Sequence, residues 1–207
     1  SYNVEKFLNQ TLDSFVCDEA VMKKFEVIVV DDGSKDNTAK IGKEYADKYP
    51  DTFRVISKEN GGHGSTINCG IRNAVGKYFK VVDGDDWVNT ADFVKLVEDL
   101  EKIESEYVFT NYNEYYDDVN RQKAVDFPQF KDGTEYDFAD VANKVYIPMH
   151  ALVIKTSVLK DNNIVIDEKC FYVDVEYVMF PVPFVNKVTF FDLHVYMYRL
   201  ALSQLRA

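Results

Sequence analysis

The stretch VVDGDDWV, residues 81–88, places three carboxylates within four positions, directly after an apolar run that is typical of a buried strand. Like charges this close together are costly unless solvent, protons or a cation offset them. Hard divalent cations such as Mg²⁺ and Mn²⁺ take carboxylate oxygens as ligands, commonly together with substrate phosphates. Asp83, Asp85 and Asp86 therefore predict a metal site at which a cation neutralises a diphosphate.

Two other structures remain open for this stretch. Asp is common in turns and at helix N-caps, so the three acids could form a solvated turn that caps the following helix. An EF-hand loop fits poorly, because Trp87 and Val88 stand where that loop requires an oxygen ligand and a glycine. We favour the metal site because the acids are clustered at the end of a strand.

Two further loops contain residue types that bind nucleotides or sugars. DDGS, residues 31–34, could offer a carboxylate to a base or a ribose hydroxyl, although an ordinary strand-to-helix turn has the same composition. NGGHGSTINCG, residues 60–70, has enough glycine for its backbone to approach a ligand, but it lacks the Lys-Ser/Thr ending of a P-loop. His63 could contact a phosphate or a sugar, whereas a single loop histidine is more often a structural hydrogen-bonding residue.

The elements that must position these loops alternate between helices and strands. Apolar periodicity and β-branched runs predict, in chain order, a helix at 3–16, a strand at 25–30, a helix ending near Pro50, a strand at 53–57, a helix at 65–75, a strand at 78–82, a helix at 90–103 and a strand at 107–112. This alternation implies an α/β fold with a parallel sheet and helices on both faces, because parallel strands need crossover connections. Ligands bind such sheets at the carboxyl ends of the strands, so both acidic turns could face one crevice.

The composition fits one soluble globular domain of 207 residues. The net charge is −11, and no basic run could follow a phosphate backbone, which argues against a nucleic-acid partner. Cys17, Cys69 and Cys170 form no CxxC pair, so we expect reduced thiols in a cytoplasmic protein. No apolar run approaches the length of a membrane span, and the first residues lack the pattern of a signal peptide.

Four motifs, read together and in order, resemble glycosyltransferase family 2, the inverting nucleotide-sugar enzymes of GT-A fold. They are SYN, DDGSKDNT, NGGHGSTINCGIRNAVGKYFKVVDGDDW and FYVDVEY. The resemblance runs from Tyr2 to the YMYR strand. It implies a single GT-A domain over 1–207, with a Rossmann-like, mostly parallel central sheet flanked by helices, a nucleotide-sugar-binding half at 1–112 and a smaller acceptor-binding half at 113–207.

The resemblance also implies roles for individual residues. Asp32 would bind the uracil, Asp85 would lie near the ribose and join the metal site, and Asp86 would bind the metal, Mn²⁺ or Mg²⁺, at the diphosphate. Asp83 would assist, and Asp174 would be the catalytic base that deprotonates the acceptor hydroxyl. The remaining residues expected in the nucleotide-sugar site are Tyr2, Gly62 and His63.

Two features depart from the family pattern. Family members begin with an apolar strand just before the residues that match Tyr2 and Asn3, so we expect the parent protein to carry such a strand immediately before Ser1. Val173 stands where many relatives carry an acidic residue before the base.

The predicted function is metal-dependent transfer of a sugar, with inversion, from a nucleotide diphosphate donor, expected to be a UDP-sugar, to a hydroxyl of a glycan or lipid-linked acceptor in bacterial polysaccharide synthesis. A lipid-linked acceptor would bring the cytoplasmic protein to the inner face of the membrane. One alternative is a sugar-1-phosphate nucleotidyltransferase, which would need a Gly-rich loop with Lys or Arg after its first strand. The other is a catalytically inactive glycan-binding domain, against which the intact acids argue.

Overall fold

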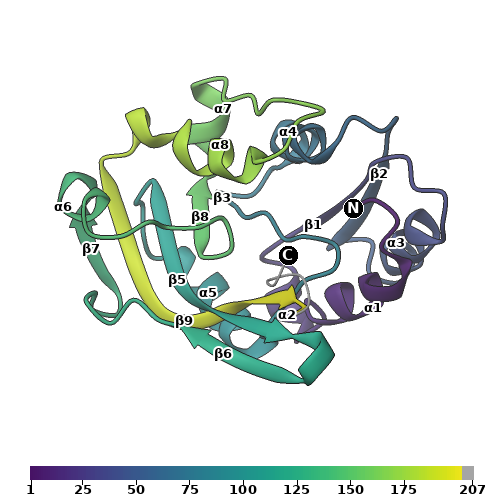
Figure 1. Cartoon of the computed structure of the whole chain (residues 1–207), viewed down its shortest axis with the longest axis horizontal. Coiled ribbons are helices and arrows are strands. Elements are labelled where there is room, and N and C mark those ends of the chain that lie inside the picture. The colour runs from purple at the N-terminus through teal and green to yellow at the C-terminus, as the bar shows by residue number, and fades with distance from the viewer. Residues whose placement is uncertain (202–207) are drawn as a thin grey trace.

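The computed structural model describes residues 1–201 and has an α/β architecture (Figure 1). Its helices are α1 (Glu5–Asp13), α2 (Glu19–Met22), α3 (Thr38–Lys48), α4 (His63–Asn73), α5 (Thr90–Leu100), α6 (Phe138–Ala142), α7 (Thr156–Asp161) and α8 (Val173–Met179), with 3-10 turns at Asp117–Val119 and Val182–Phe184. Its strands are β1 (Val27–Asp31), β2 (Phe53–Ser57), β3 (Tyr78–Phe79), β4 (Trp87–Val88), β5 (Tyr107–Tyr116), β6 (Arg121–Val125), β7 (Thr134–Asp137), β8 (Leu152–Lys155) and β9 (Lys187–Leu200). None of the helices in this described part has the length and apolar composition needed to cross a bilayer.

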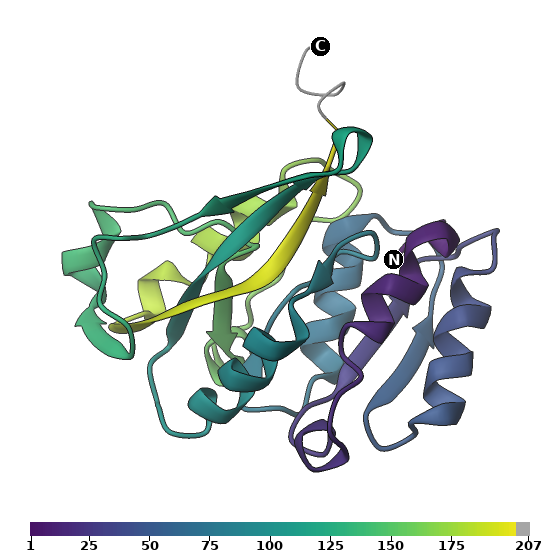
Figure 2. The same ribbon diagram turned by 90° about the horizontal axis from the view of Figure 1, so that it is seen from below.

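The strands form two sheets. β1 and β2 pair in parallel, while the larger sheet has the order β3-β8-β5-β9-β4, with β6 on β5 and β7 on β9. Over residues 1–201, β1–β2 and β5–β9 are the parallel pairs, and the other five are antiparallel. The sheet is therefore mixed rather than mostly parallel, because the later strands return as antiparallel neighbours and β9 inserts between β5 and β4. Figure 2 shows β5 and β6, in teal, running beside β9, in yellow.

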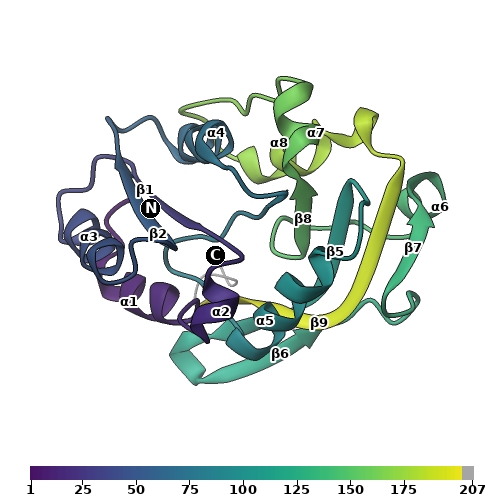
Figure 3. The ribbon, with the colours of Figure 1, turned by 180° about the vertical axis from the view of Figure 1, so that it is seen from behind.

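Successive residues of the central strands enter two different cores, as the alternation of side chains along a strand requires. Tyr107 and Phe109 of β5 pack with side chains of α4, α7 and α8, whereas Val108 belongs to the core shared with α1, α3 and α5. Figure 3 shows α5 lying across β9 on the second side. The expectation of helices on both faces is confirmed.

Both cores also join the two halves of the chain. Leu8 of α1 lies in the same core as Val195 of β9, and Ile67 of α4 lies in the same core as Phe190. A single packed body is what one domain requires.

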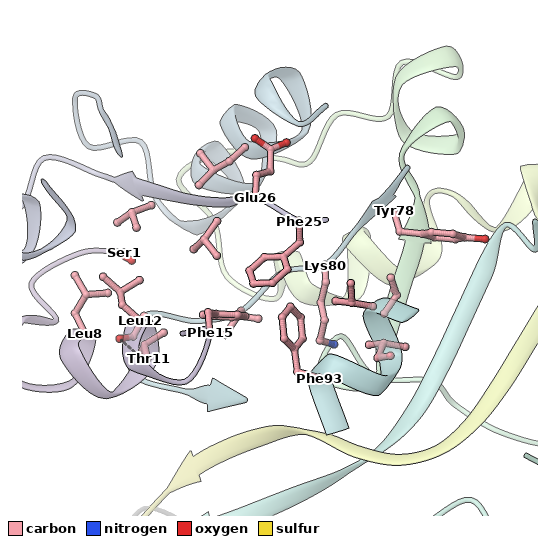
Figure 4. A pocket seen from close by; sticks show the side chains of 18 of the residues that line it. Ser1, Leu8, Thr11, Leu12, Phe15, Phe25, Glu26, Tyr78, Lys80 and Phe93 are labelled. Carbon is pink, nitrogen blue, oxygen red and sulfur yellow. Dashed lines mark hydrogen bonds between the residues drawn. The ribbon is translucent and has the colours of Figure 1, made fainter. Parts of the chain in front are cut away.

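A cavity of about 200 Å³ separates β1 from β3 (Figure 4). Its walls are mainly apolar and include Leu8, Phe15 and Phe93. Lys80 also lines it, and its Nζ donates hydrogen bonds to the carbonyl oxygens of His150 at 2.7 Å and Leu152 at 3.2 Å. Burial lowers the pKa of Lys80 to about 7.

The backbone of Ser1 pairs with β1 at the rim of this cavity. Its amino group donates to the Val30 carbonyl at 2.9 Å, and the Asp32 N–H donates to the Ser1 carbonyl at 2.9 Å. This is the hydrogen-bond pattern of a parallel ladder. The apolar strand expected before Ser1 remains a prediction.

Candidate functional site

Residues of β9 hold the acidic turn that joins β3 to β4 through hydrogen bonds. The Asp86 carboxylate is buried, with Oδ2 accepting a hydrogen bond from the Tyr196 hydroxyl at 2.6 Å and Oδ1 accepting one from the Arg199 N–H at 2.7 Å. The Tyr196 hydroxyl also accepts the Asp83 N–H at 3.2 Å. β9 therefore fixes both the backbone of the turn and the orientation of its last carboxylate.

Burial makes the negative charge of this turn costly. It raises the pKa of Asp86 to about 8 against the lowering effect of the Tyr196 and Arg199 hydrogen bonds. Burial, followed by the charge of Asp83, also raises the pKa of the Asp85 carboxyl. A bound cation would offset this cost, which is what a divalent metal site among carboxylates does.

The Arg199 guanidinium binds the backbone of the same turn and contacts none of its carboxylates. Its Nε donates to the Asp85 carbonyl at 2.7 Å, and its other nitrogens donate to Asp117 and Gln10. The guanidinium also lies over the ring of Trp87, 4.7 Å from the centroid. The half-buried Asp85 side chain thereby belongs to a turn whose backbone is held.

His63, at the start of α4, pairs with Asp83. The His63 Nε2 lies 3.2 Å from an Asp83 carboxylate oxygen. This contact raises the pKa of His63, and it lowers the pKa of Asp83 although burial alone would raise it. The pair places a partly buried imidazole beside the acidic turn.

Asp174, in the first turn of α8, lines a pocket of about 230 Å³ together with His63, Asp83 and His150. These four residues come from distant parts of the chain, and Figure 1 shows α4 and α8 side by side. Burial lowers the pKa of His150 to about 4, so its ring is neutral at pH 7. Sequence reasoning missed His150, because a single histidine before a strand carries no local motif.

The second acid of this helix is used differently. Glu176 accepts the Asp167 N–H on Oε2 at 2.8 Å and does not line the pocket. Of the two acids in VDVEY, Asp174 is therefore the one that lines the pocket, and its role as the base remains a prediction.

The rim of the pocket is aromatic. Phe171 and Tyr172 line it and are 90% and 80% exposed. Tyr172 has a φ of +65°, an outlier for a bulky residue, and such strain is concentrated at functional sites.

Asp32 lies at the end of β1, next to the glycine-rich loop. Its buried carboxylate accepts hydrogen bonds from Lys58 Nζ at 2.7 Å and from the N–H groups of Gly61 at 3.0 Å and Gly62 at 2.9 Å. Burial would raise the pKa of Asp32, but these hydrogen bonds lower it. Asp32 holds the loop that presents His63, and its role in binding uracil remains a prediction.

The glycines of this loop accommodate the protein's own backbone. A Cβ at Gly64 would lie 1.9 Å from the Asp167 carbonyl oxygen, and the Lys169 N–H donates to the Gly61 carbonyl at 3.0 Å. Gly62 has a φ of +83° and also lies against Lys169. These glycines let the segment leading to Asp174 approach the loop closely. The approach of a ligand to the same backbone, with Gly62 in the nucleotide-sugar site, remains a prediction.

The predicted site residues therefore form one connected set. Gly62 links Asp32 to His63, His63 contacts Asp83, and Asp83 shares the pocket with Asp174. Tyr2 lies beside the end of β1, with its side chain 46% exposed.

Three comparisons place this geometry among known proteins. The family model described as "Glycosyl transferase family 2" matches residues 1–162. The chain is 41% identical over 101 residues to the uncharacterized glycosyltransferase EpsJ of Bacillus subtilis, which is 49% of this chain and 28% of that protein. It is 35% identical over 96 residues to the minor teichoic acid biosynthesis protein GgaB of the same organism, which is 46% of this chain and 11% of that protein.

Among solved structures, the fold is similar to that of S. aureus TarS 1–349 in complex with UDP-GlcNAc. The TM-score is 0.79 at 24% identity, over 97% of this chain and 56% of that one. The likeness confirms the expected GT-A fold. The chain spans less than a third of the length of EpsJ and of GgaB.

Proposed function

The chain belongs to glycosyl transferase family 2, and from this premise we propose that it transfers a sugar from a UDP-sugar to a hydroxyl of a glycan or lipid-linked acceptor in cell-surface polysaccharide synthesis. Two similar proteins support this substrate class. GgaB is named as a teichoic acid biosynthesis protein, and the TarS structure contains UDP-GlcNAc. A lipid-linked acceptor would place the protein at the inner face of the membrane.

The observation that carries the proposal is the meeting of Asp174 with the acidic turn in one pocket. A carboxylate able to accept a proton shares a pocket with Asp83, which belongs to the turn whose carboxylates could hold a cation, and displacement at an anomeric carbon needs both functions. Phe171 and Tyr172, exposed at the rim, offer apolar faces to a sugar acceptor, since exposed apolar patches mark binding grooves.

The proposed reaction is a single displacement. Asp174 takes the proton of the acceptor hydroxyl, the oxygen forms a bond to the anomeric carbon, and the bond from that carbon to the UDP oxygen breaks with inversion. UDP leaves with the electron pair, on the side away from Asp174. His63, paired with Asp83, lines the same pocket and would orient the donor.

The oxygen donors of the turn fit a divalent cation. Asp83 and Asp86 bring carboxylate oxygens close together in a setting where burial penalises their charge, and Asp85 adds a third carboxylate on the same turn. When bound there, Mn²⁺ or Mg²⁺ would neutralise charge that develops on the leaving diphosphate.

We predict that Asp174→Asn lowers sugar transfer by roughly two to four orders of magnitude, because Asn keeps the size of Asp but takes no proton at neutral pH. UDP release from UDP-sugars in the presence of Mn²⁺ and acceptor sugars measures the rate, and calorimetry with UDP measures donor binding. Donor binding should stay at the parental value, since Asp174 lies on the acceptor side.

Glu176→Gln is the matched control, two positions along the same helix. Its amide oxygen can still accept the Asp167 N–H, so this variant should retain most of the transfer activity. If Glu176→Gln abolished transfer with UDP binding intact while Asp174→Asn remained active, the base would be Glu176. If no UDP-sugar were turned over by the parent chain although UDP bound, an inactive nucleotide-binding domain would be the better description.

A further inference from the structure

The ring of His150 is held in place immediately before β8. It stacks on Tyr198 with ring centroids 3.9 Å apart and an interplanar angle of 29°, and it meets the Tyr196 ring edge-on at 5.0 Å. The His150 carbonyl accepts a hydrogen bond from Lys80 Nζ at 2.7 Å. Both the ring and the backbone of this residue are therefore fixed, although it lies in the turn that precedes β8.

Neither ring nitrogen of His150 has a hydrogen-bond partner among residues 1–201, in contrast to the other two histidines of the chain. His63 pairs with Asp83, and His194 Nε2 lies 2.6 Å from an Asp126 carboxylate oxygen. A half-buried imidazole with free nitrogens, in a pocket that also contains carboxylates, has the chemistry of a metal ligand.

The distances agree with this chemistry. One ligand atom from each of Asp83, Asp86 and His150 lies within 4.8 Å of the other two. Two ligands on opposite sides of an ion at about 2.1 Å are about 4.2 Å apart, so small side-chain movements would bring all three into contact with one ion. Tyr196 binds Asp86 and packs against His150, so the same residue of β9 positions two of the three ligands.

We propose that His150 is the nitrogen ligand of the cation at the donor site, together with Asp83 and Asp86. The inference rests on the proposed function, because it concerns the cation of the same site. An imidazole suits first-row transition ions, whereas Mg²⁺ prefers oxygen ligands throughout. The site should therefore prefer Mn²⁺ or Co²⁺ to Mg²⁺, and His150 should be the source of this preference.

Pulsed electron paramagnetic resonance of the parent chain with Mn²⁺ and UDP tests the assignment. We expect a nitrogen coupling to Mn²⁺ that changes when the histidines carry ¹⁵N, which separates imidazole from the nitrogens of uracil. The coupling should vanish in His150→Gln and persist in His63→Gln and His194→Gln. The labelled parent keeps the test informative if one variant unfolds.

Calorimetry supplies the second readout. His150→Gln should weaken Mn²⁺ binding in the presence of UDP by about tenfold or more, the range found when the surroundings of a metal are altered, and should leave Mg²⁺ binding nearly unchanged. Mn²⁺ bound with UDP but without a histidine coupling in the parent would overturn the role of His150 and leave the proposed function intact. Failure of Mn²⁺ to bind with UDP would overturn the metal dependence itself.

Discussion

The carboxylate of Asp32 accepts hydrogen bonds from one lysine and two backbone N–H groups, so its charge is used inside the protein before any nucleotide arrives. Lys58 Nζ also donates to Ser65 Oγ at 2.8 Å, which ties the end of β2 to the first turn of α4. A charge held in this way contributes to stability, because hydrogen bonds to ionised groups are stronger than those between neutral groups.

Asp32→Asn should destabilise the fold by about 1–3 kcal/mol at pH 7, since the amide cannot accept all of these hydrogen bonds. The folded pKa of Asp32 lies below the usual aspartate value of 3.8, so the contribution of the charge is present above pH 3.8 and is lost as the pH falls through the folded pKa. Urea unfolding at pH 7 and at pH 3 measures this effect. The difference in the free energy of unfolding between parent and variant should be smaller at pH 3.

Asp31→Asn is the control for this prediction. The Asp31 carboxylate accepts only a weak hydrogen bond from the Ser34 N–H, at 3.2 Å, which an Asn oxygen can also accept. We therefore expect Asp31→Asn to cost less stability at pH 7 than Asp32→Asn. If the difference in the free energy of unfolding between the parent and Asp32→Asn became larger at low pH, the stabilising role of the Asp32 charge would be contradicted.

The residues that could be predicted from sequence are those whose chemistry is local. Asp83, Asp85 and Asp86 are neighbours in the chain, so their clustering was visible without a fold. His150 joins them only because β8 pairs with β3 and β5, and no local pattern encodes that pairing. The partner of the glycine loop was missed for the same reason, since Asp167 lies about a hundred positions away.

At the scale of elements, α4 and the segment before α8 form one unit. The Asn68 side chain donates to the Ile166 carbonyl at 2.8 Å and accepts the Ile166 N–H at 2.9 Å. Gly64, one turn earlier, lets the Asp167 carbonyl approach the helix. The position of Asp174 is therefore set by a contact between two elements rather than by α8 alone.

Gly64→Ala should disrupt this unit, because the added Cβ would meet the Asp167 oxygen at 1.9 Å. Overpacking of this kind costs about 1–3 kcal/mol or more, and it should displace the segment that carries Asp174. Urea unfolding measures the first effect, and the transfer rate measures the second.

Gly76→Ala provides the comparison. Its nearest neighbour would be the Tyr78 carbonyl oxygen at 3.4 Å, an ordinary contact, so the stability and the transfer rate should change little. If Gly64→Ala were tolerated as well as Gly76→Ala, the segment before α8 would not depend on close contact with α4.

The alternation of elements up to residue 112 was largely predictable, because apolar periodicity and turn residues are local signals. The mixed sheet could not be predicted from these local signals. β9 is placed between β5 and β4 by pairing with residues some eighty and a hundred positions earlier, and its register shifts near Asn111. Such pairings follow from packing over the whole molecule.

At the scale of the whole molecule, two cores enclose the sheet from both sides, and the site lies where the start of α4, the acidic turn and α8 meet. The cavity between β1 and β3 interrupts this arrangement, and Ser1 begins a ladder along its edge.

The most direct test of a metal-dependent nucleotide-sugar site is calorimetry of UDP-sugars with and without Mn²⁺, on the parent chain, Asp86→Asn and Asp83→Asn. We expect the parent to bind a UDP-sugar more tightly with Mn²⁺ than without it. Asp86→Asn should lose most of this gain in affinity while keeping the affinity measured without metal, and Asp83→Asn should lose less of it. Equal Mn²⁺-dependent binding by Asp86→Asn and the parent, or a preference of the parent for nucleoside triphosphates over UDP-sugars, would contradict the assignment of this site.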